Sequence, residues 1–394
     1  LYLAKKVKKA CSDASILAEV EEFRKVDQAL RTPSLGWDCD GRLLDGRMPK
    51  PRLSFLDSYR AEPDLVSWRD GCPKPLLEVL DRVSGLVVSK FPELDWREID
   101  PRHGPGAVAD LQKGTDKYLF PNWPNKLETV FPYTYFAQHR EDLHFEESYP
   151  YSLHEPPARL IAVPKTLKKP RMIASEPVSH QFLQLGVLKW MRQNLPHTLV
   201  SCVDFLDQEP SKLLCLSASL TGDLATVDLS AASDRLSCWT VERVFRSNPS
   251  LLNALHACRT RSLVNGTGKG ERYFSRLKKY APMGNGTTFC VQSIVYACCV
   301  IAACLYEYGI PVTGRTVDRW ARKVRVFGDD LILPSRAVPS LALLLTHLEL
   351  KVNASKTHYQ GHFRESCGMD AFRGDDVSPL YIHDLEPRDT AEGL

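Results

Sequence analysis

The sequence has almost no excess charge of either sign, since its net charge is only +3 at pH 7 over 394 residues. Overall charge therefore does not indicate a nucleic-acid-binding protein, and any site for a polyanion must come from local clustering. None of the 12 cysteines stands in a C-x-x-C pair, which argues against a zinc ribbon. A secretory signal pattern is also lacking, and this fits reduced thiols in a cytosol.

Long apolar runs are scarce as well. Only residues 289–306 approach the length of a membrane span, and Gln292 and Ser293 interrupt them, so we expect a buried core helix. The apolar fraction of 43% and the charged fraction of 25% are typical of a soluble globular protein. The length suffices for two or three domains, although the start at Leu1 rather than Met suggests a fragment.

Residues 324–333 place a Gly328-Asp329-Asp330 tip between two runs rich in Val, Phe, Ile and Leu. The apolar runs favour strands, and Gly-Asp favours the tight turn between them. Two adjacent carboxylates repel each other, so they predict a bound cation, and Mg²⁺ takes one or two protein carboxylates plus substrate phosphates. An ordinary hairpin with a polar turn is the alternative. The second copy, Gly374-Asp375-Asp376, is predicted to be a solvated loop because Pro379 follows it.

Residues 159–174 predict a second hairpin, with a basic loop between two apolar strands. Its five cations are Arg159, Lys165, Lys168, Lys169 and Arg171. In a chain of near-neutral charge, five cations in one hairpin would form a local site for a triphosphate or an RNA backbone. A solvated hairpin without a ligand is the alternative.

A third strand pattern, residues 224–229, carries Asp228 near its end. Asp228 would join the Asp329-Asp330 turn if the two elements were neighbours in one sheet, and Asp234 follows on the next turn. A helix is expected over residues 235–245, with Ser230 or Ser233 as its N-cap.

The loop at residues 282–288 is rich in glycine and opens the long apolar helix. Its donors at a helix N-terminus, on Asn285, Gly286 and Thr287, would suit anions or sugar hydroxyls. Other elements are expected as helices at 12–30 (N-cap Ser12 or Asp13), 76–91, 176–191 (N-cap Ser175) and 338–348, a strand and turn at 350–357, and a hairpin at 361–368.

The order of these segments resembles the fingers and palm of viral RNA-dependent RNA polymerases. Four stretches, at residues 227–234, 283–289, 327–335 and 363–368, are similar to the replicase beta subunit of small RNA bacteriophages, the levivirus or Q-beta type. The resemblance runs from about residue 103 to residue 382. It implies an RNA-directed RNA polymerase that replicates a positive-strand RNA phage genome.

The fold that the resemblance implies is an α+β right hand with fingers, palm and a partial thumb, whose antiparallel palm sheet is backed by helices. The expected domains are a helical and loop region at 1–100, fingers at 101–222, a palm at 223–375 with a possible fingers insertion around 250–282, and the start of a truncated thumb at 376–394.

The resemblance also implies the roles of individual residues. Asp228, Asp329 and Asp330 would bind two Mg²⁺ ions, for which Mn²⁺ is a possible substitute, and catalyse nucleotidyl transfer. Lys356, with Lys351 as its competitor, would lie near the leaving group. The expected nucleotide-binding residues are Lys165, Arg171, Asp234 (near the ribose), Asn285, Gly286 and Thr287.

Expected partners are the RNA template and product, ribonucleoside triphosphates, the host translation elongation factors Tu and Ts, and a ribosomal RNA-binding protein. The expected location is the cytoplasm of the bacterial host, without a membrane. Two other functions remain open, a reverse transcriptase and a non-catalytic RNA-binding or assembly protein on a polymerase scaffold. The acidic Asp234 argues against the first, and the three filled acidic positions argue against the second.

Overall fold

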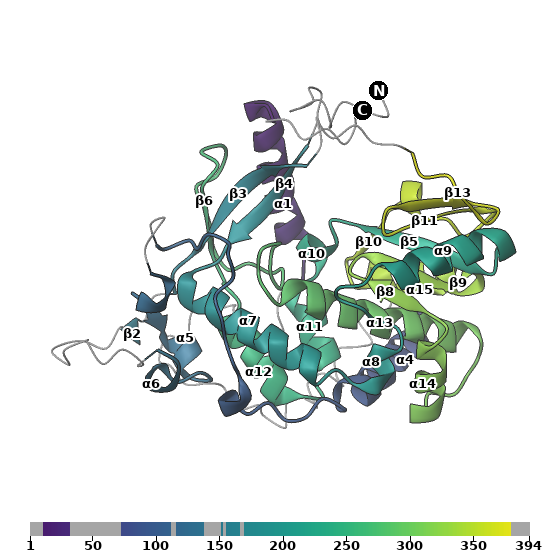
Figure 1. Cartoon of the computed structure of the whole chain (residues 1–394), viewed down its shortest axis with the longest axis horizontal. Coiled ribbons are helices and arrows are strands. Elements are labelled where there is room, and N and C mark those ends of the chain that lie inside the picture. Colours follow the sequence, from purple (N-terminus) through teal and green to yellow (C-terminus); the bar gives the residue numbers. More distant parts are fainter. Residues whose placement is uncertain are drawn as a thin grey trace, which may run out of the picture.

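The computed structural model describes residues 11–31, 72–111, 116–137, 151–152, 155–165 and 169–379. Lys168 and the predicted thumb beyond residue 379 lie outside the described residues. The described part is a mixed α/β structure with several small sheets (Figure 1).

The α-helices are α1 (Asp13–Ala29), α4 (Lys74–Val88), α5 (Asn125–Glu128), α6 (Tyr133–Phe136), α7 (Val178–Gln193), α8 (His197–Val200), α9 (Glu209–Thr221), α10 (Ala232–Arg235), α11 (Cys238–Phe245), α12 (Pro249–Cys258), α13 (Thr288–Glu307), α14 (Gly314–Ala321) and α15 (Val338–His347). The strands are β1 (Trp123–Pro124), β2 (Tyr151–Ser152), β3 (Ala158–Pro164), β4 (Pro170–Ser175), β5 (Leu224–Ser230), β6 (Leu263–Asn265), β7 (Tyr273–Phe274), β8 (Arg325–Phe327), β9 (Asp330–Pro334), β10 (Lys351–Val352), β11 (Phe363–Ser366), β12 (Met369–Phe372) and β13 (Asp375–Asp376).

The sheet that carries the acidic residues has the strand order β10-β5-β9-β8, and all its pairs are antiparallel. As expected from the apolar runs, β8 and β9 form a hairpin around the Gly328-Asp329 turn. Strand β5 pairs with β9 in a register that sets Asp228 opposite Asp330. The predicted neighbourhood of the two acidic segments is therefore confirmed.

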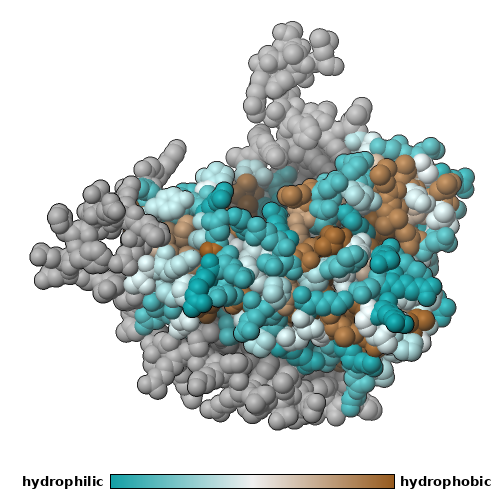
Figure 2. Space-filling model, turned by 60° about the horizontal axis from the view of Figure 1, so that its bottom comes forward, coloured by the Kyte–Doolittle hydropathy of each residue, from teal (hydrophilic) through white to brown (hydrophobic). Residues whose placement is uncertain are grey.

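Helix α13 forms the centre of the main hydrophobic core. Its residues from Cys290 to Leu305 are all buried, and it packs against helices α4 and α15 and strands β8 and β9. The helix is long and apolar enough to cross a bilayer, but 94% of its most apolar window is buried inside the structure. The expected core helix is confirmed. On the face in Figure 2, polar side chains separate the apolar patches of the described surface.

A second sheet, β4-β3-β6-β7, contains the predicted basic hairpin. Strands β3 and β4 are antiparallel from Arg159 opposite Ser175 to Pro164 opposite Pro170. Val20 and Phe23 of α1 pack against this sheet in a smaller core of their own. Figure 1 shows β3 and β4 beside α1, apart from the sheet that carries the acidic residues.

Three helix starts differ from the sequence-based expectations. Helix α7 begins at Val178, and its N-cap is Pro177 rather than Ser175. Proline disfavours helical geometry in the residue before it, which here is Glu176. The helix expected over 235–245 is split into α10 and α11, since Leu236 is extended and Ser237 caps the second segment. Neither Ser230 nor Ser233 is an N-cap, because Ala231 takes that place in a left-handed conformation.

The second Gly-Asp-Asp copy also differs from expectation. Asp375 and Asp376 form the edge strand β13, which pairs with β12, rather than a loop. Both residues are nevertheless exposed, so their carboxylates stay solvated as predicted. The β11-β12-β13 sheet packs against α9.

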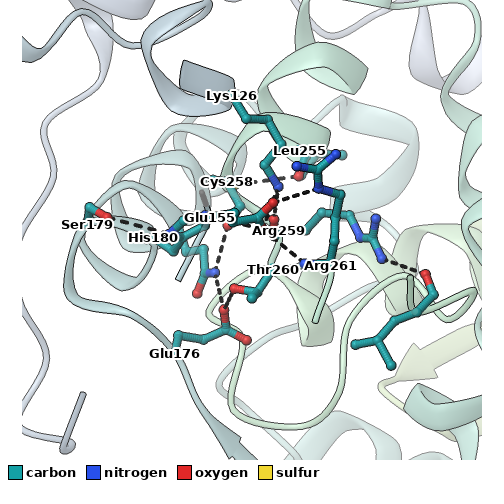
Figure 3. A network of polar contacts seen from close by, with 12 residues as sticks. Lys126, Glu155, Glu176, Ser179, His180, Leu255, Cys258, Arg259, Thr260 and Arg261 are labelled. Carbon is teal, nitrogen blue, oxygen red and sulfur yellow. Dashed lines mark hydrogen bonds and ion pairs between the residues drawn. The ribbon is translucent and has the colours of Figure 1, made fainter. Parts of the chain in front are cut away.

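A buried polar network ties the segment before β3 to helices α5, α7 and α12 (Figure 3). The Glu155 carboxylate lies 3.0 Å from Lys126 Nζ, 2.6 Å from Arg261 Nε and 3.5 Å from His180 Nε2. Burial by itself would raise the pKa of Glu155, but Lys126, His180 and Arg261 hold that pKa well below its usual range. The network therefore depends on an ionised Glu155.

Replacing Glu155 by alanine should destabilise the fold by about 3–5 kcal/mol, because its ion pairs with two largely buried cations are lost. Unfolding by urea at pH 7 measures the loss. The control is Glu271→Ala, which removes an exposed ion pair with Arg24 and should cost at most about 1 kcal/mol. Since the folded-state pKa of Glu155 is lowered, the difference from wild type should shrink as the pH falls below about 4.3. Equal losses in the two variants would contradict this account.

Candidate active site

One cavity of about 680 Å³ lies where the acidic sheet, the basic hairpin and the N-terminus of α13 meet. It is lined by Lys165, Arg171, Asp228, Leu229, Ser230, Ala231, Ala232, Ser233, Met283, Gly284, Asn285, Thr288, Phe289, Gln292, Asp329, Asn353 and Lys356. Carboxylates and cations from separate parts of the chain thus face the same space.

The Gly328-Asp329 turn is held in place by α13. Ser293 Oγ accepts a hydrogen bond from the Gly328 backbone N–H at 3.2 Å. Gly328 has a φ of +60°, and a Cβ there would lie 2.5 Å from Phe289 Cε2. The glycine is therefore required twice, for its backbone conformation and for its close approach to the helix. Asp329, which follows it, is exposed to the cavity.

Asp228 lies on β5 in a half-buried position on the cavity wall. Burial raises the pKa of its carboxyl group and Asp329 adds to the rise, while a hydrogen bond from Asn353 opposes it. Asn353 Nδ2 donates to Asp228 Oδ2 at 2.7 Å, and the Asn353 backbone N–H donates to the Asp228 carbonyl oxygen at 2.9 Å. Asn353 was missed by the sequence reasoning, which noted only lysines in that turn.

Asp330 does not line the cavity. Burial, together with Asp329 and Asp228, raises the pKa of Asp330 to about 7, although hydrogen bonding to Cys367 opposes the rise. Asp329 belongs to the turn, whereas Asp330 begins β9 and is paired with Asp228 of β5. The structure thus places Asp228 and Asp329 on the cavity wall, while Asp330, paired with Asp228, is outside the cavity lining.

Of the four cations of the basic hairpin that the structure describes, Lys165 and Arg171 line the cavity. Desolvation and the charge of Arg171 lower the pKa of Lys165, an effect that Asp329 and Asp228 oppose. Lys169 instead pairs with Glu19 of α1 at 3.0 Å, and Arg159 lies at the far end of β3. The expectation that all five cations gather in one place is wrong, because the hairpin is long and part of it packs on α1.

Lys356 lines the cavity, whereas its competitor Lys351 does not. Its Nζ donates to Glu365 Oε1 at 2.5 Å. Burial would lower the pKa of Lys356, but Glu365, Asp228 and Asp330 raise it above the ordinary lysine value. Lys356 is therefore a stable cation on the cavity wall. Glu365, on the predicted hairpin at 361–368, was not singled out from the sequence.

The glycine-rich loop contributes Asn285 to the cavity but neither Gly286 nor Thr287. The Gly286 N–H donates to Gln184 Oε1 at 3.1 Å, and Thr287 Oγ1 donates to Asn285 Oδ1 at 2.7 Å. These two residues support the loop from behind. Asp234 also lies outside the cavity lining, and its Oδ1 accepts a hydrogen bond from the buried Lys279 at 3.1 Å.

The donor set fits a hard divalent cation, although no group of three His, Cys, Asp or Glu side chains converges within the described residues. Asp228 and Asp329 supply two carboxylates on one wall, and Mg²⁺ needs only one or two when substrate phosphates complete its shell. Burial disfavours the charged form of Asp228, and a bound cation would offset this cost.

The cavity brings together acidic residues, a basic hairpin and a glycine-rich loop. These are the features expected from the resemblance to viral RNA polymerases. A family model described as RNA replicase, beta-chain, matches residues 129–386, and the chain belongs to this family. The resemblance inferred from the motifs is confirmed.

Named relatives place the chain among phage proteins. It is 35% identical over 224 residues to the RNA-directed RNA polymerase subunit beta of Qbeta virus (strain MX1), which is 57% of this chain and 35% of the relative. It is 33% identical over 245 residues to the RNA-directed RNA polymerase beta chain of Escherichia phage MS2, covering 62% of this chain and 41% of the relative. The chain thus matches between about a third and two fifths of the length of these relatives.

The turn geometry gives a test of the site's architecture. Gly328→Ala should destabilise the fold through both a left-handed alanine and a contact with Phe289, by about 2–4 kcal/mol in sum. Gly361→Ala is a matched control, since Gly361 has a similar φ of +65° but open space around its Cβ, and should cost only about 1–2 kcal/mol. Urea unfolding measures the stability of both variants. Equal stability of the two would show that a Cβ at position 328 does not clash with Phe289 of α13.

Proposed function

We propose that this chain is an RNA-directed RNA polymerase that replicates a positive-strand RNA phage genome by template-directed, two-metal nucleotidyl transfer. One observation carries the proposal: Asp228 on β5 and Asp329 in the β8–β9 turn face Lys165, Arg171 and Lys356 across a single cavity. Family membership and the names of the relatives support the reaction class. Asp330, the register partner of Asp228, is proposed as a further metal ligand.

The chemistry follows from the charges around the cavity. Asp228 and Asp329 would hold the magnesium ions, which supply activation of the primer 3′ hydroxyl and stabilisation of the leaving pyrophosphate. Asn353 fixes the rotamer of Asp228 by its hydrogen bond to Oδ2. Lys165 and Arg171 offset the charge of the incoming triphosphate. Lys356, kept protonated beside Glu365, can donate a proton from Nζ to the leaving group.

We further propose that residues 101–222 form the fingers of a right hand and that residues 223–375 form its palm. The pairing of β6 with β3 supports assigning residues 250–282 to the fingers, because it joins them to the basic hairpin. Residues 1–100 would contact partner proteins. Residues 376–394 would form the start of a thumb. The proposed partners are RNA, ribonucleoside triphosphates, elongation factors Tu and Ts and a ribosomal RNA-binding protein. The proposed location is the cytoplasm of the bacterial host. We also propose that nucleotide binding involves Asp234, Gly286 and Thr287.

The central test is Asp329→Asn, which removes a ligand charge at nearly constant shape. Template-directed incorporation of ribonucleotides with Mg²⁺ should fall roughly a hundredfold or more, since one electrostatic stabiliser of the transition state is lost. Asp375→Asn is the matched control, because Asp375 lies in the second Gly-Asp-Asp copy on an exposed edge strand. Similar losses in both variants would refute the assignment. Equal use of deoxyribonucleotides by the wild type would favour a reverse transcriptase instead.

The role of the basic hairpin is tested separately. Lys165→Ala and Arg171→Ala should each raise KM for the nucleotide and lower kcat, because a cation beside the triphosphate acts in both ground and transition states. Lys169→Ala on the same hairpin is the control, since Lys169 is engaged with Glu19 and is absent from the cavity lining. Unchanged kinetics in the first two variants would show that the hairpin is only a solvated surface.

A further inference from the structure

The loop from Met283 to Thr287, here termed the Asn285 loop, is held from two sides. On one side the Ala174 N–H of β4 donates to the Met283 carbonyl oxygen at 2.7 Å. Gly284, with a φ of +110°, lies so close that a Cβ would come within 1.9 Å of the Ala174 carbonyl oxygen. On the other side the Gly286 N–H donates to Gln184 Oε1 at 3.1 Å. Strand β4 and helix α7 therefore clamp the loop.

Gln184 is the buried half of this clamp. Its side chain has no exposed surface, and all of its amide is engaged. Nε2 donates to Cys258 O at 2.8 Å and to Glu176 Oε2 at 3.0 Å. A backbone carbonyl can only accept, so Nε2 must face Cys258 and Oε1 is left facing the loop. The orientation of the amide is thus set by α12 and by Glu176, whose Oε2 also accepts a hydrogen bond from Thr260 (Figure 3).

The consequence of the clamp is visible at Asn285. Its Oδ1 accepts from the Thr287 N–H at 2.9 Å and from Thr287 Oγ1 at 2.7 Å, which fixes the side-chain orientation. Nδ2, in contrast, is buried without a hydrogen-bond partner among the described residues, and Asn285 lines the cavity. An unsatisfied buried donor is costly, and a ligand that supplies an acceptor removes that cost.

We propose that Gln184 is a positioning residue for nucleotide binding. By fixing Gly286 it sets Asn285 Nδ2 to donate to an oxygen atom of the bound nucleoside triphosphate. The inference rests on the proposed function for the identity of the ligand. The hydrogen bond from Gly286 to Gln184 links the Asn285 loop to α7, although Gln184 itself does not line the cavity.

The test compares Gln184→Met with the wild type. Methionine keeps the length and burial of the side chain but cannot bond Gly286, so the loop loses its buried anchor. Both Kd for a ribonucleoside triphosphate with Mg²⁺, measured by calorimetry, and KM in template-directed incorporation should rise about three- to tenfold, the usual worth of one hydrogen bond. The value of kcat should change much less. An unchanged Kd and KM would overturn the proposal.

Thr260→Val is the matched control. It removes the hydrogen bond between Thr260 and Glu176 in the same buried cluster without a contact to the Asn285 loop. Thermal melts should show both variants folded with lowered Tm, yet only Gln184→Met should weaken nucleotide binding. Weakened binding in both variants would assign Gln184 to general core stability and refute a positioning role.

A double variant shows whether Gln184 acts through Asn285. Asn285→Asp keeps the Oδ1 acceptor for Thr287 and removes the Nδ2 donor. In that background Gln184→Met should raise Kd by less than twofold, since coupled residues are not additive. Fully additive effects would contradict the proposal. A wild type that binds nucleotide but incorporates none would count against the proposed polymerase function, whereas the Kd comparison would still decide the role of Gln184.

Discussion

The burial of α13 is the constraint on which the site depends. This apolar helix cannot be exposed to water without a large loss of hydrophobic free energy, so the other elements pack around it. The same helix carries the few polar groups that place the site. Ser293 Oγ holds the Gly328 turn, and the Tyr296 hydroxyl donates to the Ala232 carbonyl oxygen at 2.9 Å, just after the strand that carries Asp228. The Asn285 loop enters the first turn of the helix. One element therefore sets the relative positions of three segments that are far apart in the sequence.

Keeping the side chains of the cavity charged costs free energy when no ligand is bound. Burial and mutual repulsion raise the pKa values of Asp228 and Asp330, and desolvation lowers that of Lys165. Each shift means that the charged form is disfavoured where it stands. A cation beside the carboxylates and a polyphosphate beside Lys165 would relieve both costs together. Under the proposed function, a metal–triphosphate complex would therefore offset more of this cost than either component alone.

Much of the fold follows from local patterns. The strands around Gly328-Asp329-Asp330, the basic hairpin and the long core helix are visible as apolar runs and turn residues, and the structure contains all of them. Contacts between distant segments could not be predicted in this way. Nothing in the sequence around Lys169 indicates that Glu19 of α1 would engage it. Likewise the break at Leu236 depends on tertiary contacts, since the Tyr280 N–H donates to its carbonyl oxygen. The contacts of Asn353 and Gln184 were missed for the same reason.

The irregular backbone beside the cavity explains why such polar residues lie in the core at all. Segment 277–281 and the Asn285 loop pair only in part with strands, so their buried carbonyl and N–H groups need partners from side chains. Arg259, which has no exposed surface, donates to the carbonyl oxygens of Leu277 (3.0 Å), Lys279 (3.0 Å) and Tyr280 (2.6 Å). Gln184 Oε1 likewise satisfies a backbone group of the loop, because it accepts a hydrogen bond from the Gly286 N–H. An apolar residue at either position would leave those backbone groups unsatisfied, so a loop of this shape can stay beside the site only if the helices behind it carry buried polar side chains.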